Sequence, residues 1–227
     1  MKPTETSSPE RPDALRRKLF RGAYGGVGVM LAVQAKTALG GVVCQSPSAQ
    51  MSGNTSPRPG QTVVCSGGRS PGYWKVPQHF GEWKDATPAK VTGLAVCSTG
   101  LGNAKLTDIT DQGTLLTAIG FSGAPADVGL WAVLAFPSKF DGGQLRRHLG
   151  AAWLNAGLFI EDTAMYPLAR SQIIDMWNAT KSGGTYCPTG MTCSQSQRWT
   201  ADQVIAYIES LYNINAEIEP ELCVPTT

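Results

Sequence analysis

The sequence predicts a mainly α-helical, compact domain braced by disulfide bonds, with an irregular Gly/Pro-rich N-terminal third and few short strands. Apolar residues make up 42% of the 227 residues, which is enough to bury a sizeable core. In the second half of the chain these residues recur at helical spacing. The chain has 26 glycines and 15 prolines, and they are enriched in the first third, where they favour loops. Six cysteines supply an even number for pairing.

The composition argues against several classes of protein. Charged residues are 16% of the chain and the net formal charge is +2, which leaves no basic excess for neutralising phosphates, so no nucleic-acid partner is expected. The longest apolar run falls well short of the roughly 20 residues that cross a bilayer. We therefore expect no integral membrane span once the signal has been removed. No pattern in the chain predicts a cofactor.

Residues 1–35 have the three parts of a secretory signal peptide. The basic stretch Arg16-Arg17-Lys18-Leu19-Phe20-Arg21 is followed by the mildly apolar Gly22–Val33 and then by Val33-Gln34-Ala35, a small-x-Ala cleavage pattern. The paired arginines resemble a twin-arginine signal, although Leu-Phe reverses the usual order. The general secretory route, or an uncleaved segment that anchors the domain, are the alternatives. Either route predicts a periplasmic, cell-surface or extracellular protein. Cleavage after Ala35 removes six basic and three acidic residues, so the net charge changes from +2 to −1.

The cysteines all follow the predicted cleavage site, as expected for disulfide bonds in an exported protein. The preferred pair is Cys187–Cys193, because Cys-Pro-Thr-Gly-Met-Thr-Cys encloses a turn that brings its ends together. The other pairings stay open. The irregular spacing and the absence of a Cys-x-x-Cys pair argue against zinc, and no metal site is predicted. The disulfide candidates are Cys44, Cys65, Cys97, Cys187, Cys193 and Cys223.

Two regions are predicted after the signal. Residues 36–70 are rich in Gly, Ser, Pro, Thr and Gln and are expected to form an extended, loop-like arm pinned by Cys44 and Cys65. Residues 71–227 are expected to form a helical domain. Two short β-branched segments, Gln61–Cys65 and Val91–Val96, are the strand candidates.

Five helices are predicted in the second region from their apolar stripes and their end signals. The strongest is Gly143–Phe159, whose apolar residues lie on one side at i, i+4, i+7, i+8 and i+11. Thr200 and Gln203 form a capping box at the start of the last helix, and Trp199 can pack on Val204. The predicted ranges are Asp111–Ile119 (ended by Gly120), Pro125–Phe136 (ended by Pro137), Gly143–Phe159, Ala169–Thr180 and Thr200–Tyr212.

An aromatic segment follows the arm. Gly72-Tyr73-Trp74-Lys75 resembles the opening of the Gly-Tyr-Trp-Lys-Asn-His-Pro motif of a broad group of bacterial exported proteins, mostly uncharacterised. Gly150–Ala156 resembles the Ala-Ala-x-Leu-Asn-Ala helix of the same group, and Tyr166-Pro167-Leu168 resembles its continuation. Val76-Pro77-Gln78 replaces the Asn-His-Pro part, and His79 is displaced by two positions. The resemblance spans about residues 66–212 and implies export and a small helical domain, with no established enzymatic activity.

The aromatic segment has two interpretations. Tyr73, Trp74 and Trp83, with Lys75 at the rim, could form a platform that stacks on a sugar, so that a glycan or another surface protein would be the partner. The alternative is that the rings close one end of the helical core, which their separation in the sequence favours.

The polar residues give no catalytic assignment. No Gly-x-Ser-x-Gly elbow is present. The acidic pairs Asp108/Asp111 and Glu161/Asp162 are more typical of helix caps or solvated faces than of a glycosidase. His148 is expected on the solvated side of its helix. Asn155 is expected to be a buried amide that bonds the backbone of an irregular segment near the aromatic residues, so that Asn155→Ala would cost about 1–3 kcal/mol.

The sequence therefore predicts an exported, non-catalytic protein with a structural, adhesive or recognition role at the cell surface or outside the cell. The alternative is a secreted hydrolase that acts on a polysaccharide or envelope substrate. Loss of activity on replacing an Asp or Glu would favour this alternative.

Overall fold

The computed structural model describes residues 44–52, 67–140, 144–162 and 165–213. The chain divides into a unit of residues 1–40 and a unit of residues 41–227, and all the described residues belong to the second. The predicted signal peptide, the strand candidate Gln61–Cys65 and the cysteines at 65 and 223 lie outside the described residues. Within them the fold is mainly helical with few short strands, as the sequence predicts.

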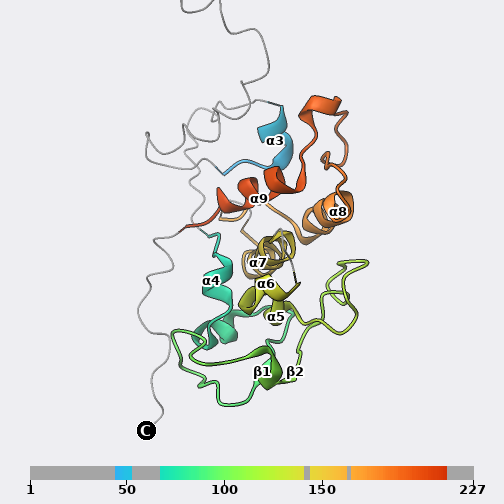
Figure 1. Ribbon diagram of the computed structural model, residues 1–227. Helices are drawn as coiled ribbons and strands as arrows, with labels where there is room; N and C mark the ends of the chain where they lie inside the picture. Colours follow the sequence, from blue (N-terminus) through green and yellow to red (C-terminus); the bar gives the residue numbers. More distant parts are fainter. Residues whose placement is uncertain (1–43, 53–66, 141–143, 163–164, 214–227) are drawn as a thin grey trace, which may run out of the picture. The chain divides into compact units, whose positions relative to one another are not determined.

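Helix α7 (Leu145–Leu158) is the centre of the domain (Figure 1). Eleven of its 14 residues are buried, because other helices cover most of its circumference. Its neighbours are α4 (Pro71–Trp74), α5 (Leu130–Ala135), α8 (Arg170–Thr180) and α9 (Ala201–Glu209). The strongest predicted helix is thus confirmed and forms the core of the fold.

The remaining elements are short. Helix α6 (Pro137–Phe140) follows α5 directly, and α3 (Pro47–Met51) lies within the arm that the sequence predicts to be extended. Strands β1 (Lys90–Val91) and β2 (Ile109–Asp111) form a two-stranded antiparallel sheet in which Lys90 pairs with Asp111. Three turns of 3₁₀-helix complete the described chain: η2 (Pro77–Glu82), η3 (Leu106–Asp108) and η4 (Gln195–Gln197).

The start of α9 follows the predicted capping box. The Thr200 hydroxyl accepts the Gln203 backbone N–H at 3.5 Å, and the Thr200 backbone N–H donates to Gln203 Oε1 at 2.9 Å. These bonds satisfy two of the backbone N–H groups that a helix start leaves without intrahelical partners. Helix α8 also begins and ends within one residue of its predicted bounds.

The predicted helix Asp111–Ile119 is wrong. Asp111 ends β2, and residues 112–120 form turns whose backbone pairs with the segment before α5. The Leu116 N–H donates to the Val128 carbonyl at 3.0 Å, and the Leu130 N–H donates to the Thr114 carbonyl at 2.8 Å. Gly113 has a φ of +65°, where a Cβ would lie 2.4 Å from the Thr87 carbonyl oxygen. A left-handed residue with its backbone packed on another segment cannot continue a helix.

Two other boundaries also differ from prediction. Helix α5 begins at Leu130 rather than Pro125, because the Pro125 carbonyl accepts the Val128 N–H in a turn. The strand candidate Val91–Val96 is reduced to β1, and Val96 is 75% exposed. An isolated apolar run gives no signal for where its partner strand ends, and here the pairing with β2 ends at Val91.

Aromatic residues fill much of the core. All six tryptophans of the chain are buried, and Trp74 and Trp131 have no exposed surface. Phe121 stacks on Trp177 at 5.2 Å between ring centroids, and Phe80 meets Trp131 edge to face at 6.4 Å. Aromatic side chains bury large areas, so these contacts join the loops before α5 to the helices.

Arg170 links three parts of the domain at the start of α8. Its guanidinium lies 3.6 Å from the centroid of the Trp153 ring on α7. It also donates to Asp85 Oδ2 at 3.0 Å and to the Lys84 carbonyl at 2.9 Å. Because the guanidinium is planar and carries donors in fixed directions, it can stack on Trp153 and donate to the Lys84–Asp85 segment at once. The segment after η2 is thereby fixed to the α7–α8 pair.

No helix among the described residues has both the length and the apolar character needed to cross a membrane.

The preferred disulfide is confirmed. Cys187 and Cys193 are bonded, with their Cα atoms 6.0 Å apart. Cys44 and Cys97 are disulfide-bonded as well, so every cysteine in the described part of the chain is oxidised. The Cys187–Cys193 bond lies in the connection between α8 and α9, whose base is closed by reciprocal hydrogen bonds between Tyr186 and Trp199 at 2.8 and 2.9 Å.

We expect the double variant Cys187→Ser/Cys193→Ser to fold and to lose only about 2 kcal/mol of unfolding free energy. Closing so short a loop restricts the unfolded chain little, and the Tyr186–Trp199 pairing still closes the connection. Urea unfolding would measure the difference, with Ser196→Ala in the same loop as the control. A variant that fails to fold would show that the bond stabilises more than its own loop.

Candidate functional site

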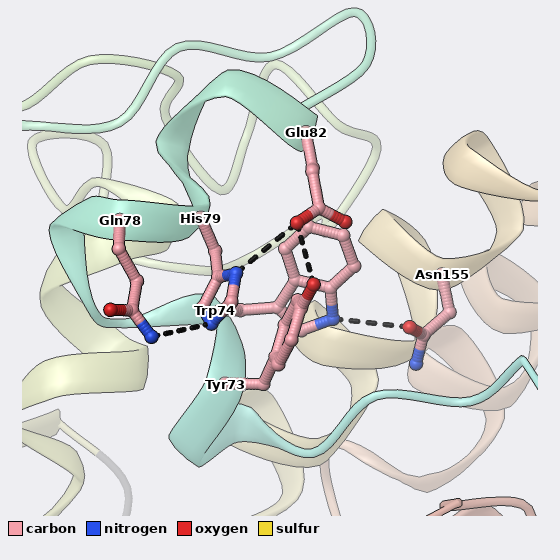
Figure 2. A network of polar contacts seen from close by, with 6 residues as sticks. All are labelled: Tyr73, Trp74, Gln78, His79, Glu82 and Asn155. Carbon is pink, nitrogen blue, oxygen red and sulfur yellow. Dashed lines mark hydrogen bonds and ion pairs between the residues drawn. The ribbon is translucent and has the colours of Figure 1, made fainter. Parts of the chain in front are cut away.

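Two consecutive helical turns position the aromatic segment. The Ser70 hydroxyl caps α4 by accepting the Gly72 and Tyr73 N–H groups at 3.2 and 3.4 Å, and Pro71 occupies the first turn. Pro77 then starts η2, which carries Gln78, His79 and Glu82 back over Tyr73. Figure 2 shows the resulting polar network of Tyr73, Trp74, Gln78, His79, Glu82 and Asn155.

Asn155 occupies the buried end of this network, with no exposed surface. Its Oδ1 accepts the Arg69 backbone N–H at 2.9 Å and Trp74 Nε1–H at 3.1 Å. Its Nδ2 donates to the Arg69 carbonyl at 2.9 Å. The sequence predicts this arrangement, a buried amide bonded to irregular backbone beside the aromatic segment. One amide thus joins α7 to the chain that enters α4.

His79 lies at the other end, between two polar side chains. Its Nδ1 is 3.1 Å from Glu82 Oε1, and its Nε2 is 3.0 Å from Gln78 Nε2. An ionised carboxylate can only accept, so we assign the proton to Nδ1, and the Gln78 amide then donates to Nε2. The imidazole stacks on the Tyr73 ring at 3.5 Å between centroids, and the Tyr73 hydroxyl donates to the same Glu82 oxygen at 2.5 Å.

The charge of Glu82 is set by its neighbours. Burial of the carboxyl group raises its pKa. The hydrogen bonds from His79 and Tyr73, with the nearby positive charge of Arg69, lower the pKa by more than burial raises it. The net result is a pKa below the ordinary value. Glu82 is therefore a carboxylate at neutral pH and an acceptor for both rings.

We expect Glu82→Gln to destabilise the protein at neutral pH by about 1 kcal/mol, because hydrogen bonds to a charged acceptor are stronger than those to an amide. A carboxyl with a lowered folded-state pKa stabilises above its unfolded pKa and loses this contribution as the pH falls through the folded value. The gap between wild type and variant should therefore close below the ordinary pKa of 4.5. Unfolding curves across this range would measure it, with the exposed Glu161→Gln as control. A gap independent of pH would contradict an ionised Glu82.

The aromatic rings of the sequence-predicted binding residues are in the interior. Tyr73, Trp74 and Trp83 are 4%, 0% and 7% exposed. Tyr73 packs edge to face on Trp74 at 5.4 Å, and the Lys75 carbonyl accepts Trp131 Nε1–H at 2.9 Å. Rings so covered present no open face to a sugar, and their burial corresponds to the packing alternative.

The acidic pairs act locally. Asp108 Oδ2 accepts the Lys105 N–H at 2.8 Å at the start of η3, and Asp111 Oδ1 accepts the Gly113 N–H at 2.9 Å. Asp162 Oδ1 accepts the Met165 N–H at 3.1 Å. These three are turn-capping carboxylates, the alternative to a glycosidase pair that the sequence favours.

The expected solvent exposure of His148 is wrong, because the side chain is buried. His148 is 7% exposed, covered by the end of α9 and the residues that follow it. Sequence reasoning also missed the network around His79, Glu82 and Arg69. Its only signal is the i, i+3 spacing of His79 and Glu82 directly after a helix-starting proline.

The described surface contains two open hollows outside this network. One, about 390 Å³, lies between Lys84–Asp85 and residues 157–162 at the end of α7. The other, about 350 Å³, is lined by residues of the 92–108 loop. Among the described residues, no group of three or more His, Cys, Asp or Glu side chains is placed to hold a metal ion. Neither hollow is lined by a residue of the polar network.

No protein-family model, curated protein or solved structure matches this chain. The resemblance of Gly72–Lys75 and Gly150–Ala156 to the group of exported proteins stays a prediction. The two segments that carry it are in direct contact, since Trp74 donates to Asn155.

Proposed function

We propose that this protein is exported and acts at the cell surface or outside the cell in a non-catalytic role, as a structural, adhesive or recognition protein. The observation that carries the proposal is the oxidation of Cys44, Cys97, Cys187 and Cys193, which are all the cysteines in the described ranges. Structural disulfides form and persist in oxidising compartments and are rare in the cytoplasm. The Arg16–Ala35 signal pattern supports the same destination.

The helical core supports export in a folded state. A twin-arginine route carries folded proteins out of a compartment that keeps thiols reduced, so the fold has to form before its disulfides. Helix α7 and the helices around it bury a continuous apolar core; of the described cysteines, Cys44 packs against this core and none is among its buried members. Such a core can form before the cysteines are oxidised.

The chemistry of the network supports a non-catalytic role. Asn155 uses its carbonyl and amide groups to hold Arg69 and Trp74, and Glu82 is engaged by Tyr73 and His79. A glycosidase needs one carboxylic acid whose pKa is raised so that it can protonate the leaving group. The pKa of Glu82 is shifted the other way.

The intact mass of the full chain expressed in bacteria would test export. We expect the periplasmic or secreted protein to lack residues 1–35 and to take up no alkylating reagent unless it is first reduced. Arg16→Lys/Arg17→Lys should retain the precursor in the cytoplasm, while Arg11→Lys should be exported normally. Recovery of an intact Met1 with six free thiols would overturn both export and disulfide bonding.

Incubation with envelope and extracellular polysaccharides would test the non-catalytic role. We expect no release of shorter chains. Turnover that is lost on replacing an Asp or Glu would instead establish a secreted hydrolase.

A further inference from the structure

A second buried histidine joins α7 to the end of α9. His148 Nδ1 lies 3.0 Å from the Tyr212 hydroxyl, and the two rings are nearly parallel, at 20° and 6.1 Å between centroids. On its other side, His148 Nε2 lies 3.6 Å from the Glu209 carboxylate. Both partners come from the last turn of α9 and the residues that follow it.

The residues that follow α9 also hold the chain that enters α4. Tyr212 pairs with Gly68 in a parallel bridge, and the Asn213 N–H donates to the Gly68 carbonyl at 2.7 Å. Leu211 packs against Gly68 so closely that a Cβ there would lie 2.1 Å from the Leu211 carbonyl oxygen. Arg69, the next residue, is the one bonded by Asn155. His148 thus supports a junction between the end of α9 and the segment that enters α4.

The environment of His148 disfavours the imidazolium ion. Burial of the ring, and secondarily the positive charge of Arg147, lower its pKa from 6.5 to about 4. In the described part of the chain, the titratable and charged groups placed around it are Arg147 on α7, Glu209 on α9 and Tyr212 after α9. Glu209 favours the ion, but its side chain is 53% exposed, so solvent weakens that attraction.

We propose that His148 is an acid-operated latch: protonation of its ring releases the end of α9 and the pairing of Tyr212 and Asn213 with Gly68, while the α5–α7–α8 core stays folded. This inference goes beyond the proposed function and does not depend on it. The opening is local because it involves the last turn of α9 and the residues directly after it, and the end of a helix opens more readily than the middle of a core.

Proton linkage determines whether a fall in pH favours the open or the closed junction. A histidine whose folded-state pKa is lowered binds its proton more readily when the junction is open, so opening becomes more favourable as the pH falls below the ordinary value of 6.5. One coupled proton raises the opening equilibrium constant by at most about tenfold per pH unit. The effect levels off near a pH of about 4, where the closed form is protonated too.

Hydrogen exchange of the full chain, followed by mass spectrometry and corrected for the intrinsic effect of pH, would test the latch. Between neutral pH and a pH of about 5, we expect the protection of backbone amides in peptides covering 208–213 to fall by about tenfold or more. Peptides covering α7 and α8 should keep their protection. Equal loss of protection across all the helices would overturn the proposal in favour of global unfolding.

The two histidines of the chain provide a matched pair of variants. His148→Gln should remove the pH dependence in peptides 208–213, and His79→Gln should retain it. An unchanged pH dependence in His148→Gln would overturn the latch. Should His148→Gln fail to fold, Glu209→Gln tests the same geometry, because removing the carboxylate that favours the ion should increase opening in acid. Reduced opening in Glu209→Gln would contradict the proposed charge balance.

Discussion

We expect Asn155→Ala to lower the free energy of unfolding by about 3–5 kcal/mol, more than the sequence alone suggests. The substitution removes the partner of three buried groups at once: the Arg69 N–H, the Arg69 carbonyl and Trp74 Nε1. Each buried polar group left without a partner costs about 1–3 kcal/mol, although such costs do not add fully. Urea unfolding at neutral pH would measure the loss.

Asn178→Ala is the matched control for this variant. Asn178 is an exposed asparagine on α8 whose amide oxygen accepts from Ser122 and Lys181 at the surface. The same change of side chain there should alter the unfolding free energy by only about 0.5 kcal/mol. Equal effects of the two substitutions would contradict the role of Asn155 as the link between α7 and the chain entering α4.

Gly68→Ala is expected to destabilise the protein by about 3 kcal/mol or more, because the new methyl group would overlap backbone rather than a movable side chain. The Cβ would lie 2.1 Å from the Leu211 carbonyl oxygen and 2.8 Å from the Leu211 carbonyl carbon. Relief requires the segment at Gly68 to move away from the end of α9. That movement breaks the hydrogen bond from Asn213 to Gly68.

Gly81→Ala provides the comparison. Gly81 lies in η2, and a Cβ there would meet nothing within 4 Å. The substitution should leave stability within about 0.5 kcal/mol of wild type or raise it slightly, since alanine restricts the unfolded chain. An unfolding free energy of Gly68→Ala within about 0.5 kcal/mol of wild type would show that Gly68 and Leu211 do not pack as described.

The helices that the sequence predicts well are those with their own local signals. Helices α7 and α8 have apolar residues at helical spacing, and α9 begins at a capping box. Each signal lies within one stretch of chain, so periodicity and end residues are enough to find it. The Cys187–Cys193 bond was predictable for the same reason, since its loop is short.

The errors arise where distant segments decide the structure. Residues 112–120 have apolar residues at plausible helical spacing, yet their backbone pairs with residues 128–130. His148 was misplaced because the groups that cover it, Glu209 and Tyr212, are more than 60 residues away. Local pattern gives no information about either contact.

The candidate site was predictable in part. Asn155 could be identified because a polar amide near the end of an apolar helix needs a buried partner. The enclosure of His79 by Gln78, Tyr73 and Glu82 depends on how η2 folds back over α4, which proline positions alone do not specify. The residues predicted to bind a sugar are buried, and the orientation of Tyr73 and Trp74 toward the core depends on the packing of α4 against α5 and α7.

The burial of every tryptophan gives the protein six internal optical reporters. They are spread over the chain: Trp74 on α4, Trp83 after η2, Trp131 on α5, Trp153 on α7, Trp177 on α8 and Trp199 before α9. Intrinsic fluorescence should therefore shift to longer wavelength on unfolding without any added dye. Single Trp→Phe variants, each compared with wild type, would show whether the surroundings of Trp74 on α4 and of Trp177 on α8 lose their packing together.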